Sequence, residues 1–191
     1  MKRLGILLSV VVLLSGCAAP KPNDPASSVP PAVSSEDLPE PEIIAPSFDM
    51  EAYKVSAADL CDEIQSMSII LGNMGKWEKS FMETLGRPSD DVVSRAYEWL
   101  EKEAGTTQDD VEASNEKIST MLLDLASSTE GEEADAIFEQ VSSLHGNYIA
   151  LYSVVTTPPL SVADFGTEFS EYFSAVASDL DELKVSLDTV S

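Results

Sequence analysis

Residues 56–88, SAADLCDEIQSMSIILGNMGKWEKSFMETLGRP, carry the pattern that decides the fold. Apolar side chains recur there every three or four positions, which is the spacing of one face of an α-helix. Ser56, followed three residues later by an aspartate, resembles a capping box, and Gly86 with a proline two residues later is typical of a helix end. Gly72 and Gly75 would allow a kink or break within this helix. The predicted inward stripe is Leu60, Ile64, Met67, Leu71, Met74, Trp77, Phe81 and Leu85.

The same spacing predicts two helices after this one. Ser89 is placed to cap a short helix that ends at Gly105, and Thr107 with Asp110 opens the next. The polar run at residues 127–131 predicts a turn after it. The predicted inward residues of these two helices are Val92, Val93, Ala96, Trp99, Leu100, Val111, Ile118, Leu122 and Leu125.

Two longer helices follow. The first stops before Pro158 and Pro159, and the second starts near Ser161 and Asp164 and runs nearly to the last residue. Their inward residues are Ala134, Phe138, Val141, Leu144, Tyr148, Leu151, Val155, Val162, Phe165, Phe169, Phe173, Val176, Leu180, Leu183 and Leu187. Short connections and the lack of a strand pattern predict an all-α fold, an elongated antiparallel helical bundle of about five helices. The alternative is an extended coiled-coil hairpin of the first and last helices, which the inward aromatic residues disfavour.

Residues 1–16 have the order of a secretory signal peptide. Met1-Lys2-Arg3 is cationic, and the 11 residues from Leu4 to Leu14 carry no charge. A permanent helical span needs about 20 apolar residues, so this stretch is short for one. The leader therefore predicts export.

Leu14-Ser15-Gly16-Cys17 ends this leader and resembles the lipobox of bacterial lipoproteins. The resemblance covers residues 1–17. It implies recognition of these four residues by a signal peptidase, a diacylglycerol in thioether linkage on Cys17, and cleavage just before that cysteine. Acyl chains contribute about 0.8 kcal/mol per buried CH₂, and two chains anchor stably where one is marginal. The alternative is an ordinary secreted protein whose Cys17 merely lies near the cleavage site.

The resemblance also implies a location. The mature protein would be extracytoplasmic and lipid-anchored to the cell membrane, with membrane lipid as its partner through the acylated Cys17. In a cell with two membranes, Ala18 favours the outer one, because it is not the aspartate that resembles an inner-membrane retention signal.

Residues 17–47 are predicted to be a lipidated cysteine followed by a disordered linker. Residues 18–47 hold eight prolines and few large apolar groups, so they cannot form a core. An extended polyproline chain of this length reaches at most roughly 90 Å. The linker therefore predicts a spacer between the membrane and the helical domain, residues 48–191.

The chain is strongly acidic. It has 11 Lys and Arg against 34 Asp and Glu, so its formal charge is 11 − 34 = −23. Nucleic acid is excluded as a partner, because binding it depends on cationic side chains. The acidic runs at residues 109–112, 130–133 and 179–182 favour a solvated face, although a cationic envelope protein, peptide or wall polymer would be attracted to them.

Residues for catalysis or metal binding are scarce. His145 is the one histidine, and the Glu-x-x-His pattern of metal-binding bundles is absent around it. We expect no metal, cofactor or catalytic residue. Cys61 is predicted to be a small buried hydrophobe, with an intermolecular disulfide or a reactive thiol as the alternatives.

These observations predict a non-enzymatic binding or scaffolding lipoprotein of the cell envelope. One alternative is a ligand-sensing bundle with the ligand near Trp77, Trp99, Tyr148 or Tyr152. The other is an envelope hydrolase that brings Asp or Glu side chains together from separate helices.

Overall fold

The computed structural model describes residues 48–87, 91–159 and 161–189. This part of the chain is all-α, as predicted, and has no strand. Its helices are α1 Met50–Leu85, α2 Val92–Ala104, α3 Gln108–Ser127, α4 Glu132–Thr156 and α5 Val162–Thr189. None of these helices is long and apolar enough to cross a membrane. The predicted leader, lipobox and linker, and the Ser89 cap, lie outside the described residues.

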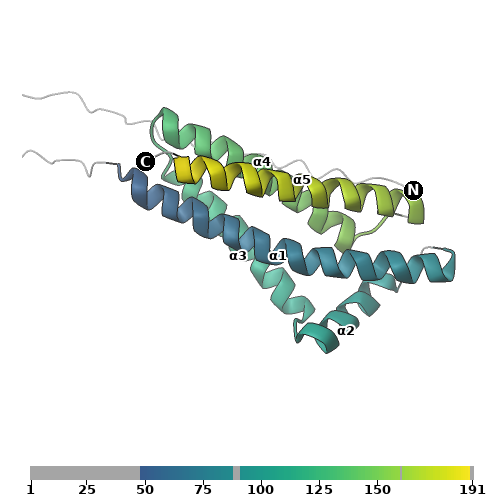
Figure 1. Cartoon of the computed structure of the whole chain (residues 1–191). Coiled ribbons are helices and arrows are strands. Elements are labelled where there is room, and N and C mark those ends of the chain that lie inside the picture. Colours follow the sequence, from purple (N-terminus) through teal and green to yellow (C-terminus); the bar gives the residue numbers. More distant parts are fainter. Residues whose placement is uncertain (1–47, 88–90, 160, 190–191) are drawn as a thin grey trace, which may run out of the picture. The chain divides into compact units, whose positions relative to one another are not determined.

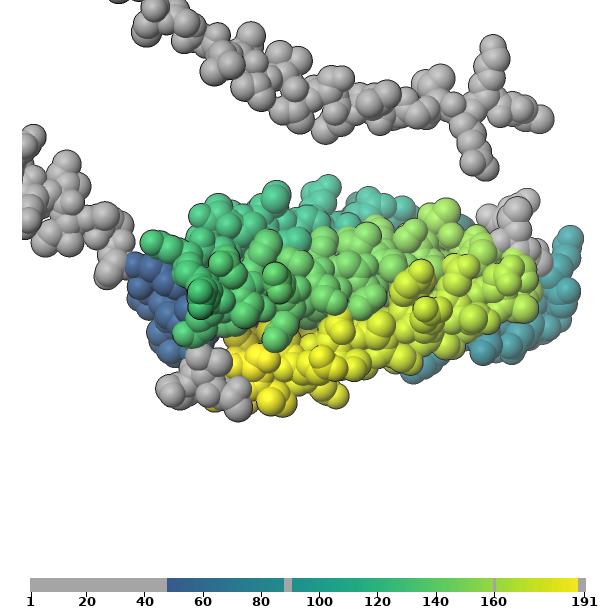
Figure 2. Space-filling view, turned by 90° about the horizontal axis from the view of Figure 1, so that it is seen from above, coloured from purple at the N-terminus to yellow at the C-terminus, as the bar shows by residue number. Residues whose placement is uncertain are grey.

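The four long helices run alternately up and down, and the short α2 is inserted between α1 and α3 (Figure 1). α1 and α4 run in the same direction (Figure 1), and near their starts Tyr53 donates a hydrogen bond to the carbonyl of Ala134 at 3.3 Å. α4 and α5 run antiparallel and lie side by side on the face shown in Figure 2. α1 packs against α3, α4 and α5, so the coiled-coil hairpin alternative is wrong.

Most of the predicted helix ends are confirmed. Gly86 and Gly105 end α1 and α2 in the left-handed conformation, with φ of 66° and 67°, which glycine adopts without strain. Thr107 and Asp110 form the capping box of α3, in which the Asp110 amide donates to the Thr107 hydroxyl at 3.2 Å. The predicted start at Ser56 is wrong. Asp49 caps α1 instead, and the Ser56 hydroxyl donates to the carbonyl of Ala52 inside the helix.

The glycines within α1 have a packing role rather than a hinge role. α1 continues unbroken through Gly72 and Gly75. The Phe173 ring lies against Gly72 and the Phe169 ring against Gly75, so closely that a Cβ at either glycine would clash with the ring. The absence of two side chains therefore lets α5 approach α1.

The predicted stripe of α1 holds from Leu60 to Met74 and fails after it. Trp77 is only half-buried and Leu85 is 45% exposed, whereas Glu78 and Met82 are fully buried. Four-residue steps from Met74 reach positions 78 and 82, which continue the face that packs on the other helices. Glutamate is rarely buried, so the sequence pattern favours the neighbouring aromatic residues as the inward ones.

Candidate functional site

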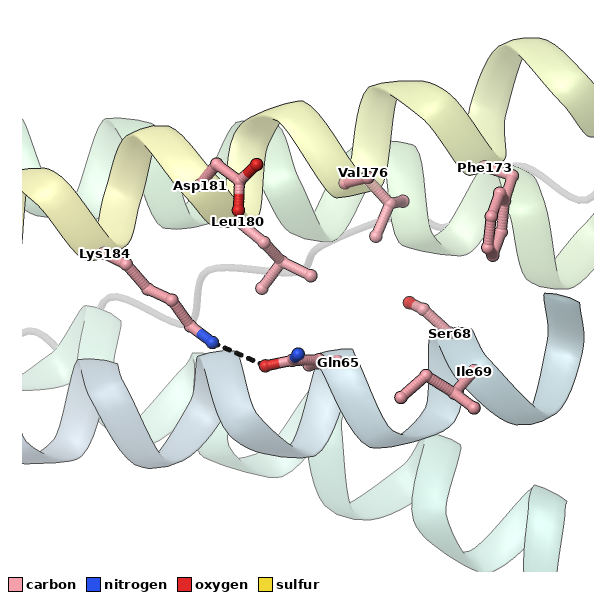
Figure 3. A pocket seen from close by; sticks show the side chains of 9 residues that line it. Gln65, Ser68, Ile69, Phe173, Val176, Leu180, Asp181 and Lys184 are labelled. Carbon is pink, nitrogen blue, oxygen red and sulfur yellow. Dashed lines mark hydrogen bonds between the residues drawn. The ribbon is translucent and has the colours of Figure 1, made fainter.

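An open groove lies between α1 and α5 (Figure 3). Its volume is about 190 Å³. The side chains that line it are largely apolar on α5 and mixed on α1. They are Gln65, Ser68, Ile69, Phe173, Val176, Ala177, Leu180, Asp181 and Lys184.

The groove exists because the close packing of α5 side chains against α1 stops one turn before Gly72. From Gly72 onward the rings of α5 fill the space against α1. At Ser68 the α1 side chain is small, and Ala177 is the corresponding small residue on the rim of α5. Ile69 stands beside the opening and is 55% exposed. The groove thus has a largely apolar floor beside one exposed apolar side chain.

Ser68 supplies the groove with an unpaired hydrogen-bonding group. The residue is 5% exposed, and its hydroxyl has no hydrogen-bond partner among the described residues. Serines inside helices commonly donate to the carbonyl four residues earlier, as Ser66 does to Asp62 at 2.8 Å. Ser68 does not, and its side chain points toward α5 (Figure 3). A buried hydroxyl without a partner costs free energy, so Ser68 marks a place where the packing of α1 on α5 is incomplete.

Charged groups border both ends of the groove. At one end the Lys184 ammonium donates to the side-chain oxygen of Gln65 and lies 3.9 Å from the Asp62 carboxylate. At the other end the Lys76 ammonium lies 5.4 Å from the centroid of the Phe173 ring. Both cations are therefore engaged within the protein. The Asp181 carboxylate stands exposed on the α5 rim, where it can meet a cationic group of a partner.

A second hollow of about 220 Å³ lies between α1 and α3. Asp59 of α1 and Asp124 of α3 line it together with Ser56 and Ser128. These are two carboxylates from separate helices, the kind of pair that the hydrolase alternative requires.

Glu78 is the most unusual side chain in the described part of the chain. It is fully buried, and neither carboxylate oxygen has a hydrogen-bond partner there. Burial raises the pKa of the Glu78 carboxyl to about 8, because the charged form loses its hydration. The side chain is therefore mostly protonated near neutral pH. The sequence signal that would have found it is the four-residue step from Met74.

The two residues singled out for possible chemistry are both apart from the groove opening. Cys61 is 1% exposed, as predicted for a small hydrophobe. Burial, aided by the Asp62 carboxylate, raises the pKa of its thiol to about 11, which disfavours the reactive thiolate. His145 is half-buried beside Tyr148, its Nε2 has no partner among the described residues, and burial lowers its pKa.

The four aromatic residues considered as neighbours of a ligand form two pairs in the fold. Trp77 stacks on Trp99 across the α1 and α2 interface, with ring centroids 6.1 Å apart. Tyr148 is buried on α4 and donates to the side-chain oxygen of Asn115 at 3.1 Å. Tyr152 lies one turn further along α4, with its ring centroid 6.4 Å from that of Tyr148.

No cluster of three or more histidine, cysteine, aspartate or glutamate side chains suited to a metal ion occurs in the described ranges. No protein-family model, curated protein or solved structure matches the chain.

Proposed function

We propose that this protein is a lipid-anchored extracytoplasmic lipoprotein whose helical domain is a non-enzymatic binding module of the cell envelope. The anchor is supported by the sequence order of the leader and of Leu14-Ser15-Gly16-Cys17. Two acyl chains on Cys17 and a linker of up to roughly 90 Å would hold the helical domain at a distance from the bilayer.

The observation that carries the binding function is the groove between α1 and α5. It combines an apolar floor, an exposed Ile69 and the unpartnered hydroxyl of Ser68. Its occupant in this proposal is a cationic, amphipathic segment of another envelope protein. An apolar side chain of that segment lies in the groove, and a neighbouring lysine or arginine meets Asp181.

Charge supports this choice of occupant. Residues 48–191 hold 8 basic and 29 acidic side chains, so the domain carries 8 − 29 = −21. A field of this sign speeds the approach of cationic partners and repels anionic ones. The Asp62 carboxylate, 3.9 Å from the Lys184 ammonium, offsets part of that charge, and Lys76 lies over the Phe173 ring at the other end of the groove. A helix laid into a groove through apolar anchors is a common mode of peptide recognition.

The anchor is tested by growing cells with labelled palmitate and comparing the unaltered chain with Cys17→Ser. We expect label on the unaltered protein and its recovery with membranes, and we expect the variant to lose both. An unlabelled protein, or a variant that still fractionates with membranes, contradicts the anchor.

The groove is tested with the full-length lipidated protein in nanodiscs of zwitterionic lipid, with empty nanodiscs as the blank. The probes are a helical peptide of lysine and leucine and its glutamate and leucine counterpart of equal length. The cationic peptide should bind, and Ala177→Trp, which fills the groove, should weaken binding at least about tenfold, or 1.4 kcal/mol. Ala136→Trp, at an exposed position of α4, is the matched control.

Three outcomes contradict the groove proposal. They are equal binding of the anionic peptide, binding that Ala177→Trp leaves unchanged, and stabilisation by small neutral ligands with no binding of the cationic peptide. The last outcome would favour the ligand-sensing alternative instead.

A further inference from the structure

Glu78 occupies a place where a protein core ordinarily holds an apolar residue. It lies on α1 between Met74 and Met82, both fully buried, and is itself 0% exposed. Unpartnered buried carboxyls are rare because the group must give up its hydrogen bonds to water. An isosteric apolar residue would fill the same volume without that cost. The carboxyl therefore costs stability, and ionising it in place would raise that cost further.

The helix that covers this region is the one most weakly attached to the rest. Among the described residues α2 packs chiefly on α1, and Figure 1 shows it at the edge of the helical unit. Gly86 precedes α2 and Gly105 follows it, both with positive φ and both with open space where a Cβ would stand. A movement of α2 away from α1 would therefore turn at these two glycines, where nothing packs against the backbone.

Few other ionisable groups face Glu78. Tyr97 of α2 interacts with it electrostatically and is itself within reach of Tyr152 of α4 and Glu112 of α3. Burial raises the pKa of Tyr97 to about 12, so this phenol stays neutral where a carboxyl titrates. α5 presents uncharged groups to this part of α1, the Phe169 ring at Gly75 and the backbone of Gly166 against the Lys79 side chain.

We propose that Glu78 is a proton-operated switch for α2. With its carboxyl protonated, α2 is docked on α1. The ionised carboxylate requires hydration, so α2 separates from α1 and water reaches the group. Release uncovers the buried side chains of α2, such as Val92 and Leu100, and separates the stacked rings of Trp77 and Trp99. Acidic surroundings thus hold this surface closed, and its opening becomes progressively more favourable as pH rises, independently of the membrane anchor and of the α1 and α5 groove.

The sign and size of the effect follow from linkage. The docked state holds its proton up to about pH 8, whereas an exposed glutamate releases it near pH 4.5, the ordinary value. Between these two pH values the equilibrium constant for release rises about tenfold per pH unit, and it is constant above and below that window.

The test is hydrogen exchange of the full-length protein in nanodiscs between about pH 5 and pH 7.5, corrected for the intrinsic exchange rate. We expect the opening constant of α2 peptides to rise about a hundredfold or more over this range while α4 peptides stay level. Glu78→Gln should remove the dependence, and Glu83→Gln, at an exposed position of the same helix, should keep it. Glu78→Met serves if the glutamine variant does not fold.

Tryptophan fluorescence gives a second readout, because the chain has two tryptophans and both lie at the α1 and α2 interface. The emission should shift to longer wavelength over the same pH range in the unaltered chain only. The proposal is overturned by level exchange of α2 in the unaltered chain, by a dependence that survives Glu78→Gln or Glu78→Met, or by an equal rise in α4, which would mean global unfolding. Carboxyl ¹³C NMR adds a direct check, because the glutamate signal that is missing from Glu78→Gln belongs to Glu78. If that signal titrated at the ordinary pKa of a glutamate, the proposal would also be overturned.

Discussion

Gly75 and Glu78 lie one turn apart on α1, and both are buried, but their neighbours suit them very differently. At Gly75 the missing side chain is matched by the Phe169 ring, which occupies the space that a Cβ would take. At Glu78 the carboxyl meets no hydrogen-bond donor among the described residues. The first position is complementary in shape, and the second is mismatched in chemistry. Burial alone therefore says little about whether a residue stabilises its fold.

The largest expected effect is at the complementary position. Phe169→Ala removes a ring that is 5% exposed and leaves a cavity against Gly75, so the free energy of unfolding should fall by about 3–5 kcal/mol. Urea titration of the full-length chain, followed by far-UV circular dichroism, measures it. Leu123→Ala, at a side chain that is 70% exposed, should stay within about 0.5 kcal/mol. A loss below about 1 kcal/mol for Phe169→Ala would mean that α5 does not rest on this contact.

At Glu78, the mismatched position, a substitution should raise the free energy of unfolding instead of lowering it. Glu78→Leu should raise the free energy of unfolding by about 3 kcal/mol near pH 7, because the native carboxyl, with its pKa raised to about 8, resists an ionisation that the unfolded chain permits. The penalty is absent below the unfolded pKa, grows as pH rises, and levels off above about pH 8. The ionisation part of the gain from Glu78→Leu should therefore shrink toward zero near pH 4.

Urea titrations across this pH range measure the gain, and Glu83→Leu is the exposed control. His145 opposes the trend, since burial lowers its pKa and stability is lost when it protonates at acidic pH. It is present in both variants and cancels in the comparison. A gain for Glu78→Leu that is independent of pH would show that packing, not ionisation, accounts for it.

A third experiment separates shape from helix propensity. Gly75→Ala should destabilise by about 1–3 kcal/mol, because the new Cβ clashes with the Phe169 ring, although alanine is the better helix former. Gly146→Ala is the matched control, since open space surrounds that α4 position, and it should stabilise by up to about 1 kcal/mol. In a Phe169→Ala background Gly75→Ala should become neutral or stabilising. Additive effects in this double-mutant cycle would disprove the contact.

The smallest expected effect concerns the start of α3, away from both Gly75 and Glu78. Thr107→Ala removes one half of the α3 capping box and should lower the free energy of unfolding by about 1 kcal/mol. Thr106→Ala, one residue earlier and outside the box, should change it by less than about 0.5 kcal/mol. Equal effects in the two variants, measured by thermal unfolding, would show that the box adds nothing to the stability of this domain.

The local rules of the chain were readable without a structure. Three- and four-residue spacing predicted the helices, Gly86 and Gly105 their ends, and Thr107 with Asp110 a start, because each of these depends on neighbouring residues alone. The failures have a common origin. Ser56 satisfies the capping rule, but a cap earlier in the chain, at Asp49, extends the helix past it. A rule applied to one segment does not see a competing signal outside that segment.

The candidate site was not predictable in the same way. Ser68 lies in the buried stripe four residues after Ile64, yet nothing local shows that its hydroxyl would lack a partner. Asp181 and Ile69 were ordinary surface positions in the sequence and face one groove only because α5 returns antiparallel to α1. Which residues from two distant helices meet depends on the register between them.

The sequence by itself determined that this chain folds into about five helices, where most of them end, and the order of charged, apolar and small residues that predicts export and lipidation at Cys17. These follow from interactions within a few residues of one another. The tertiary structure alone decided that Gly72 and Gly75 receive aromatic rings, that Glu78 is enclosed without a partner, and that a groove opens beside Ser68. Each of these depends on the shape and chemistry of a helix more than 12 residues away in the chain, which no local pattern encodes.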